Sequence, residues 1–455
     1  MSRPLRFCMA STFYPPWSFG GDAIQVRRLA HALADRGHEV TVVHSREGYR
    51  SMAGAAPDGP EDSHPGVRVV GIDAGLGALS PLATYLTGRP LLAGRKLAAA
   101  LDEPFDVVHF HNPSLLGGPE ALMLGTGIKL YTAHEQWLVC PTHVLWKYQQ
   151  RVCEKPDCWR CTFSYRRPPQ PWRSTSLLER SLSHLDALIC PSRASEVLHR
   201  RFASIVRIER LGHFVPDPNV SQPDHAERSS GDDRERPVGS GPERPVAGRP
   251  QRSVASGSER RAGERPYFLF AGRLESIKGV GALLEAFRRR REAGEDLLIA
   301  GEGTLEPELR DAAADLPRVR FLGWRSAADL DALYRGALAV IVPTAGHESF
   351  GLVAVEAFAR EAPVLVRGFG ALGELIEESG GGLAFTTDAE LDAALGRLAG
   401  DAPLRAELGA KGRAAYEARF TEERHLDRYL GLIGDLAHRR GRRDVAALAT
   451  RELAE

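Results

Sequence analysis

Two basic residues in the second half of the chain have the types and the spacing to hold phosphate. Arg273 and Lys278 lie in the segment GRLESIKG, directly after the apolar run YFLFA, which predicts a strand ending in a loop that leads to a helix. A guanidinium group offers a planar fork to phosphate oxygens, a lysine adds a mobile charge, and amides at a helix start add positive potential. The pair therefore suits a diphosphate, although solvated surface pairs also show this spacing.

Two carboxylates farther along, Glu348 and Glu356, bracket seven residues in the segment HESFGLVAVEAFA. We expect Glu348 in a loop and Glu356 about one and a half turns inside a helix that starts near Phe350. Carboxylates accept hydrogen bonds from vicinal hydroxyls, and a helix start containing Gly351 adds an anion site. Two solvated acids are the alternative, but an acid beside Val355 on an apolar segment needs partners. The pattern favours one contact with a sugar and one with a ribose.

The order of apolar runs along the chain predicts the elements that position these residues. Residues 1–216 and 265–417 each alternate strand-like runs with helical patterns, which indicates an α/β fold with doubly wound parallel sheets. Ligands of such sheets lie beyond the carboxyl ends of the strands, so two facing domains would form an interdomain cleft. Residues 217–264 contain no Leu, Ile, Met, Phe, Tyr or Trp, which predicts a disordered linker; a docking tail is the alternative.

Composition excludes several other classes of protein. The 455 residues predict two or three domains, and the 59 basic residues equal the 59 acidic ones, so no nucleic-acid partner is expected. No apolar run reaches the roughly 18 residues of a membrane-spanning helix, and the start of the chain lacks the apolar core of a signal peptide. Six cysteines in such a chain indicate reduced thiols or a metal site. We therefore expect a cytoplasmic protein.

Three separated motifs together resemble a known enzyme family. The segment GRLESIKG, followed by HESFGLVAVEAFA, resembles the donor-site signature of family 4-type retaining glycosyltransferases, also called glycosyl transferases group 1. The glycine pair before VRRLAHALADRGHEVTVVH resembles the first loop and helix of that family, and GAKGRAAYEARFTEERHLDRYLGLI resembles its closing helices. The resemblance implies the GT-B architecture of two facing Rossmann-like domains. It also implies that the helices of residues 418–455 partly cross back to the N-terminal domain.

The resemblance implies a role for each motif residue. Arg273 and Lys278 would bind the donor diphosphate and neutralise it as it leaves, Glu348 would contact the transferred sugar, and Glu356 would accept both ribose hydroxyls. His134, at the end of the run YTAHE, would reach the sugar near the reaction centre. Arg273, Lys278, Glu348 and His134 would thus be the catalytic residues. The resemblance also implies further contacts with the donor, from Gly20, Gly21, Phe350, Gly351, Glu302 and Trp324.

One residue departs from the family pattern, and the family's chemistry also predicts that catalysis needs no metal. Ser349 stands where many relatives have glycine, which puts the detailed sugar contacts in doubt but not the class. The family stabilises the leaving diphosphate with the two cations and helix amides, and nothing here resembles a metal-binding D-x-D motif. No cofactor or metal is therefore predicted for catalysis.

Residues 135–175 fit neither run of alternating elements and are rich in Cys and Trp. The spacing C-x12-C-x4-C-x2-C predicts a structural zinc site with four thiolates, with His143 as a substitute ligand; four reduced, packed thiols are the alternative. The same stretch holds four tryptophans and a surplus of basic residues. It could form an acceptor lid, a peripheral contact with the inner face of a membrane for a lipid-linked acceptor, or an aromatic core. The residues concerned are Cys140, Cys153, Cys158, Cys161, Trp137, Trp146, Trp159 and Trp172.

The leading hypothesis is transfer of a hexose from a nucleotide-diphosphate sugar to a hydroxyl acceptor in polysaccharide or glycoconjugate biosynthesis. The acceptor would be a glycan, a lipid-linked saccharide or a small molecule. A nucleotide-sugar epimerase of the same fold and a non-catalytic nucleotide-sugar-binding protein are the alternatives. A dehydrogenase is disfavoured because no G-x-G-x-x-G follows the first strand.

Overall fold

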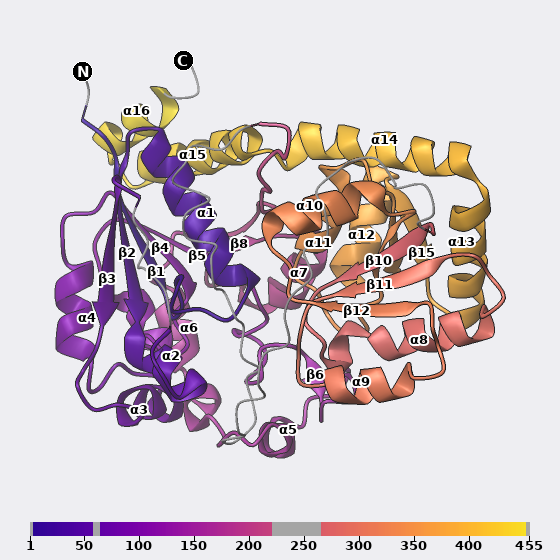
Figure 1. Cartoon of the computed structure of the whole chain (residues 1–455). Helices are drawn as coiled ribbons and strands as arrows, with labels where there is room; N and C mark the ends of the chain where they lie inside the picture. Colours follow the sequence, from indigo (N-terminus) through magenta and orange to yellow (C-terminus); the bar gives the residue numbers. More distant parts are fainter. Residues whose placement is uncertain (1–2, 58–63, 221–264, 452–455) are drawn as a thin grey trace.

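The computed structural model describes residues 3–57, 64–220 and 265–451, which fold around two parallel sheets (Figure 1). The predicted α/β class with two parallel-sheet domains is confirmed. Of the predicted linker at 217–264, residues 221–264 lie outside the described residues. No helix of the described ranges combines the length and the apolar composition that crossing a bilayer requires.

The first sheet has seven parallel strands in the order β3-β2-β1-β4-β5-β8-β9. These strands are β1 (Arg6–Ser11), β2 (Glu39–Ser45), β3 (Val67–Ile72), β4 (Val107–Asn112), β5 (Ile128–Thr132), β8 (Ala187–Cys190) and β9 (Ile208–Arg210). The main helices between them are α1 (Gly21–Asp35), α2 (Arg46–Ala53), α3 (Leu79–Thr87), α4 (Gly94–Leu101), α6 (Leu177–Leu182) and α7 (Arg193–His199). Strands such as β4 are buried along their whole length because helices cover both faces of the sheet.

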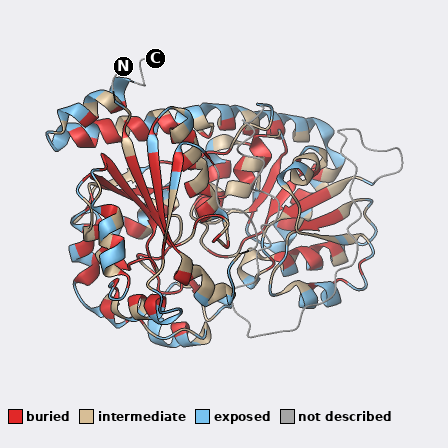
Figure 2. Cartoon of the chain, turned by 60° about the vertical axis from the view of Figure 1, so that its left-hand side comes forward, coloured by how far each residue is buried: buried red, intermediate tan, exposed pale blue. Residues whose placement is uncertain are grey.

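The second sheet has six parallel strands in the order β12-β11-β10-β13-β14-β15. These strands are β10 (Tyr267–Ala271), β11 (Asp296–Ala300), β12 (Val319–Gly323), β13 (Val340–Val342), β14 (Val364–Arg367) and β15 (Gly382–Phe385). Its helices are α8 (Val280–Arg289), α9 (Glu306–Ala312), α10 (Ala327–Gly336), α11 (Leu352–Phe358), α12 (Gly370–Ser379) and α13 (Asp388–Gly400). Buried residues fill the strands of both sheets and the helix faces turned toward them (Figure 2).

The start of α11 differs slightly from the sequence-based expectation. The helix begins at Leu352 rather than near Phe350, because Gly351 adopts a left-handed backbone with φ 103° and ends the preceding loop. A side chain at Gly351 would also bring its Cβ to 2.7 Å from the side chain of Leu372. Glu356 lies inside the helix, as predicted, but about one turn from its start rather than one and a half.

The C-terminal helices join the two domains. Helix α14 (Ala402–Arg419) packs on the second domain, and α15 (Glu422–Arg439) and α16 (Arg443–Arg451) lie along the first (Figure 1). Leu426, Leu430 and Ile433 of α15 belong to the same buried cluster as Met9 and Leu130 of the first sheet. The crossing is therefore held by apolar packing against the sheet.

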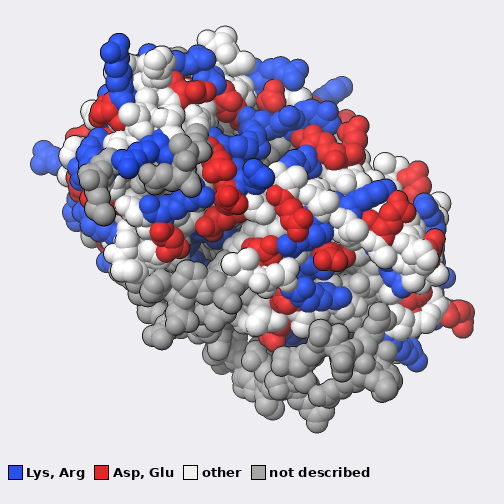
Figure 3. All heavy atoms as spheres, turned by 90° about the horizontal axis from the view of Figure 1, so that it is seen from above, with Lys and Arg blue, Asp and Glu red and all other residues white. Residues whose placement is uncertain are grey.

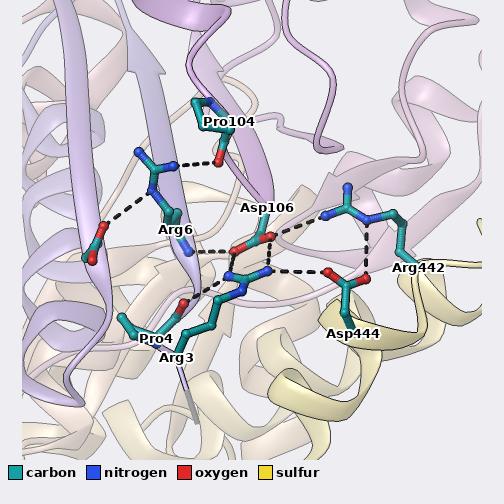
Figure 4. A network of polar contacts seen from close by, with 8 residues as sticks. Arg3, Pro4, Arg6, Pro104, Asp106, Arg442 and Asp444 are labelled. Atoms are coloured by element: carbon teal, nitrogen blue, oxygen red, sulfur yellow. Dashed lines mark hydrogen bonds and ion pairs between the residues drawn. The ribbon is translucent and has the colours of Figure 1, made fainter.

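A buried carboxylate adds a polar clamp at the end of this crossing. Asp106 accepts two hydrogen bonds from the guanidinium of Arg3 at 2.6 and 2.9 Å, one from the Arg6 amide at 3.0 Å and one from Arg442 at 3.3 Å (Figure 4). Its side chain is 4% exposed, whereas that of neighbouring Asp444 is 56% exposed. Asp106 thus ties the N-terminus and the start of α16 to the first sheet.

Replacing Asp106 by alanine should destabilise this domain by about 2–3 kcal/mol, because four donors lose a buried, charged acceptor. Urea denaturation would measure the loss, and hydrogen exchange should rise in α16. The matched control is Asp444→Ala, which removes an exposed acid from the same network and should cost less than about 1 kcal/mol. Equal effects of the two substitutions would show that Asp106 does not act as the clamp.

Candidate functional site

The loop after β10 carries the two predicted phosphate-binding cations. It runs from Gly272 through a short 3-10 turn, Ser276–Lys278, to Gly279 at the start of α8. Gly279 has φ 74°, and a Cβ there would lie 2.4 Å from the carbonyl oxygen of Pro343. Only glycine fits this close approach, which holds Lys278 against the end of β13.

Lys278 and Glu348 form a direct pair although seventy positions separate them. The Lys278 Nζ lies 2.6 Å from Glu348 Oε1, and the Thr344 hydroxyl donates to the same oxygen at 3.1 Å. Burial alone would raise the pKa of Glu348, but the charge and hydrogen bond of Lys278, the Thr344 hydroxyl and the charge of Arg273 together hold it below its ordinary value. Glu348 is therefore an anion at neutral pH, with its charge balanced by Lys278.

Arg273 lies between this pair and the first domain. Its guanidinium pairs with Glu275 at 2.9 Å and is 43% exposed, so it remains accessible to a ligand. Its charge acts on Glu348 and also on Asp22, which follows the glycine pair at the start of α1. The structure thus brings Arg273, Lys278 and Glu348 together and places them near the first domain.

The glycine pair shows no steric need for glycine within the fold. Gly20 has an extended backbone with φ −179°, and a Cβ on it would meet Asp22 only at 3.7 Å. A Cβ on Gly21 would lie 3.5 Å from the side chain of Leu352, across the two domains. A methyl group would therefore fit at either position, and the charge of Arg273 in the second domain acts on Asp22 beside them.

The sequence analysis did not predict a polar cluster that lies beside the start of α1. The Asn112 amide donates to Glu135 at 2.9 Å and to Asp22 at 3.4 Å, and His143 Nδ1 lies 2.6 Å from Glu135. Burial, with the charge of Glu135, raises the pKa of Asp22. The sequence did contain a signal: Asn112 ends a strand, Glu135 follows His134, and Asp22 follows the glycines. His143 thus contacts an acid, and its role as a substitute zinc ligand stays a prediction.

His134 is partly exposed and contacts a chain of buried imidazoles. Its Nε2 lies 2.8 Å from Nδ1 of His111, and its ring stacks on that of His213 with centroids 4.8 Å apart. Burial, with the charge of His111, lowers the pKa of His134 well below its ordinary value. His134 is therefore neutral at pH 7, and the position of its ring is fixed by two further histidines that the sequence analysis did not single out.

These rings line a cavity of about 20 Å³ between the first sheet and α15. His109 on β4 and His425 on α15 also line it, together with the Tyr429 hydroxyl, which bonds His109 Nδ1 at 2.9 Å. His425 donates from Nδ1 to the carbonyl of Gly212 at 2.8 Å. The cavity is large enough for about one water molecule, and its lining is unusually rich in titratable groups.

Glu356 has the partners that a half-buried acid requires. Its Oε2 accepts from the Tyr334 hydroxyl at 3.1 Å, and its Oε1 lies 3.5 Å from Arg28 of α1. Arg28 belongs to the first domain, so the predicted ribose acceptor is held by a contact between domains. Neither Arg28 nor Tyr334 was predicted, because they lie far from Glu356 in the sequence.

Ser349 and Phe350 join the domains beside His134. The Ser349 hydroxyl donates to the His134 carbonyl, and the Ser349 carbonyl accepts from the Ser192 hydroxyl at 2.8 Å. The Phe350 ring is 6% exposed and packs edge-on against His213. The serine that departs from the family pattern thus fixes the loop of Glu348 to the loop of His134.

Glu302 and Trp324 lie together at the ends of neighbouring strands. Glu302 is exposed, and its Oε1 accepts from the Trp324 amide at 3.3 Å. The Glu302 carbonyl also accepts from the Leu274 amide at 2.9 Å, next to Arg273. Both residues therefore border the loop of Arg273, but no hydrogen bond or ion pair joins their side chains to Lys278 or Glu348 in the described part of the chain.

The Cys- and Trp-rich insert lies against the cation loop. It contains the two-stranded antiparallel pair β6 (Trp146–Lys147) and β7 (Arg151–Val152) and helix α5 (Cys158–Ser164). The Trp146 indole donates to the Ser276 hydroxyl at 3.3 Å, and that hydroxyl donates to the Gln149 carbonyl at 3.2 Å. The insert is thus placed to influence what enters beside Lys278.

The four insert cysteines share one neighbourhood. Burial, with the thiols of Cys140, Cys158 and Cys161, raises the pKa of Cys153. Within residues 3–57, 64–220 and 265–451, no three His, Cys, Asp or Glu side chains are arranged to hold a metal ion. The structural zinc site stays a prediction.

Family models match both halves of the chain. One described as Glycosyltransferase Family 4 matches residues 19–210, and one described as Glycosyl transferases group 1 matches residues 265–401. D-inositol 3-phosphate glycosyltransferase of Stackebrandtia nassauensis is 36% identical over 187 residues, which is 38% of this chain and 42% of the relative. Glycogen synthase of Mycobacterium tuberculosis is 41% identical over 113 residues, 24% of this chain and 27% of the relative. The matched part thus spans less than half the length of these relatives.

Solved structures resemble the whole fold. Sucrose-phosphate synthase from Thermosynechococcus elongatus has a TM-score of 0.64 at 20% identity, covering 92% of this chain and 96% of its own. Anabaena HepE in complex with UDP-glucose has a TM-score of 0.58 at 17% identity, covering 92% of this chain and 97% of its own. These likenesses establish the GT-B arrangement of the two parallel-sheet domains.

Proposed function

The chain belongs to the family 4-type glycosyltransferases of the GT-B fold, and we propose that it moves a sugar from a nucleotide-diphosphate donor to a hydroxyl acceptor with retention of anomeric configuration. One observation carries this proposal. Lys278 and Arg273 place two positive charges on one loop, beside the anion of Glu348, and the charge of Arg273 reaches Asp22, which follows Gly20 and Gly21 in the first domain. That arrangement suits a diphosphate flanked by a sugar.

The cations would act on the bond that breaks. As the bond between the anomeric carbon and the phosphate oxygen lengthens, negative charge collects on the diphosphate, and Arg273 and Lys278 stabilise it. Lys278 already neutralises Glu348, so the donor would share Lys278 with that acid. Glu348 would then direct its carboxylate to hydroxyls of the transferred sugar, while neutral His134 offers a hydrogen bond without adding charge.

The acceptor oxygen would form the new bond on the face that the diphosphate leaves. Its proton would pass to the departing phosphate oxygen, so the products are the glycosylated acceptor and the free nucleoside diphosphate. In this mechanism the protein needs no separate general base. It also needs no divalent cation, because the loop cations supply the positive charge, and turnover should survive treatment with EDTA.

Uridine diphosphate sugars are the first donors to test, because HepE of the same fold is known in complex with UDP-glucose. Thermal unfolding should be followed with UDP-, ADP- and GDP-sugars, since a bound donor raises the apparent melting temperature. Proton NMR of the product should then show a retained anomeric centre, with hydroxyl acceptors that include inositol phosphate. A change of the donor sugar in the absence of any acceptor would indicate an epimerase and would contradict the proposal.

Replacing Glu356 by glutamine should weaken donor binding by more than about tenfold, because the ribose would lose a charged acceptor. The KM for the donor should rise while kcat changes little, since the ribose is remote from the reacting bond. The matched control is Glu377→Gln, an acid with a 74% exposed side chain in the same domain. A donor KM unchanged in Glu356→Gln would exclude the ribose contact.

A further inference from the structure

Helix α3 shows its apolar side to solvent. Leu79, Leu82 and Leu86 recur at helical spacing and are 62%, 44% and 36% exposed. On the opposite side of the helix, Ser80 and Thr84 are 5% and 2% exposed. A surface helix of a soluble domain normally has the reverse arrangement, with the apolar stripe inward. The apolar side of α3 is therefore available to a partner outside the chain.

The same surface extends into the segments on either side of α3. Leu76 before the helix and Leu91 and Leu92 after it are 48%, 59% and 46% exposed. We call Leu76, Leu79, Leu82, Leu86, Leu91 and Leu92 the leucine surface. These six make up the majority of the exposed large apolar residues among the described ones, so the clustering is not the usual scatter of single side chains.

Packing elsewhere fixes α3 in this orientation. The Trp172 indole donates to the Tyr85 carbonyl at 3.0 Å, and a Cβ on Gly88 would come within 2.9 Å of the Trp172 and Leu177 side chains. The polar side of α3 thus lies against the protein at the end of the helix. The leucines cannot turn inward without breaking these contacts.

Basic side chains outnumber acidic ones around the leucine surface, although Arg89 pairs with Glu120 at 3.5 Å and the Glu47 carboxylate accepts from the Leu76 amide at 2.9 Å. Residues 74–101 contain no Asp or Glu but include Arg89, Arg95 and Lys96, all exposed. Arg167 of the insert also acts on Tyr85 of α3. In contrast, the face formed by α14, α15 and α16 carries basic and acidic side chains interspersed (Figure 3). The basic residues therefore mark the leucine surface as one that fits an anionic partner.

We propose that the leucine surface docks the protein on an anionic phospholipid bilayer. Leucines on one side of a helix enter the boundary between headgroups and acyl chains, and flanking lysines and arginines attract acidic lipids. A second copy of the chain is a poorer occupant, because symmetric pairing would bring like charges together. Docking would occur at the carboxyl end of the first sheet, since α3 packs on α2, which begins directly after β2. A membrane-borne acceptor would then lie near His134, a consequence that rests on the proposed function.

Vesicle co-sedimentation of the full chain, without any sugar donor, tests the docking independently of catalysis. The protein should bind vesicles of phosphatidylglycerol mixed with phosphatidylcholine, bind phosphatidylcholine alone much less, and be released by high salt. Leu79→Ser/Leu82→Ser/Leu86→Ser should lose binding by at least about tenfold, because three apolar side chains no longer enter the bilayer. Leu91→Ser/Leu92→Ser gives a second variant outside the helix.

The matched control is Val197→Ser/Val220→Ser, which removes apolar side chains that are 52% and 64% exposed outside the leucine surface, one on α7 and one after the first domain. This control should bind vesicles like the parent, and circular dichroism should show that all variants are folded. Equal vesicle binding by the leucine variants, or no binding by the parent, would overturn the proposal. It would also be overturned if light scattering without lipid showed a dimer that the leucine variants abolish.

Discussion

Turnover should fall by at least about a hundredfold when Arg273 and Lys278 are both replaced by alanine. Charge that develops on a leaving diphosphate is stabilised by preorganised donors, and removing one such donor typically costs two to three powers of ten. Lys278→Ala also leaves Glu348 without its cation, so the pKa of Glu348 should rise in that variant. The measurement is kcat from steady-state release of nucleoside diphosphate.

The control for this result removes an arginine and a lysine from the surface of the same domain. Arg291 has a 78% exposed side chain, and Lys411 pairs with Glu407 at the same 2.6 Å distance that separates Lys278 from Glu348. Arg291→Ala/Lys411→Ala should leave kcat within about twofold, since exposed pairs contribute little. If the site variant behaved like this control, the phosphate role of Arg273 and Lys278 would be wrong.

Mild acid should destabilise the first domain through its buried histidines. Burial, opposed only in part by the hydrogen bond to Gly212, lowers the pKa of His425 from an ordinary value near 6.5 to about 4. Between pH 6.5 and 4, His425 therefore binds a proton in the unfolded chain but stays neutral in the folded chain. The contribution of this histidine to the free energy of unfolding is fully present above pH 6.5. It falls by about 3 kcal/mol as the pH drops toward 4.

Urea denaturation between pH 7 and 4 measures this loss. His425→Asn keeps a side-chain donor for the Gly212 carbonyl but cannot be protonated. The pH dependence of the free energy of unfolding should therefore correspond to the uptake of about one proton fewer on unfolding. His438→Asn, on the exposed side of the same helix, is the control and should leave the pH dependence unchanged. An unchanged pH dependence in His425→Asn would show that this ring is not the group that resists protonation.

Features that depend on neighbours in the sequence could be predicted, and features that depend on distant contacts could not. Apolar runs and their spacing predicted two parallel sheets, and motif residues predicted the family. The pairing of Arg28 with Glu356 could not be foreseen, since it joins helices in different domains. The His111–His134 contact is of the same kind, because it depends on which strands are neighbours in the sheet.

The leucine surface illustrates a different limit. Helical spacing shows that Leu79, Leu82 and Leu86 share one side of α3, but not whether that side faces the core. The direction is set by the contacts of Tyr85 and Gly88 with residues near position 172, which tertiary structure alone supplies. The zinc expectation depends in the same way on distances between thiols that spacing does not determine.

Calorimetric titration with UDP and with UMP tests most directly whether the loop of Arg273 and Lys278 holds a diphosphate. The two ligands differ by one phosphate, so their difference in affinity reports on the groups that bind it. The parent protein should bind UDP at least about tenfold more tightly than UMP, and Arg273→Ala/Lys278→Ala should remove that preference. A preference for UDP that survived intact in the double variant would contradict the account.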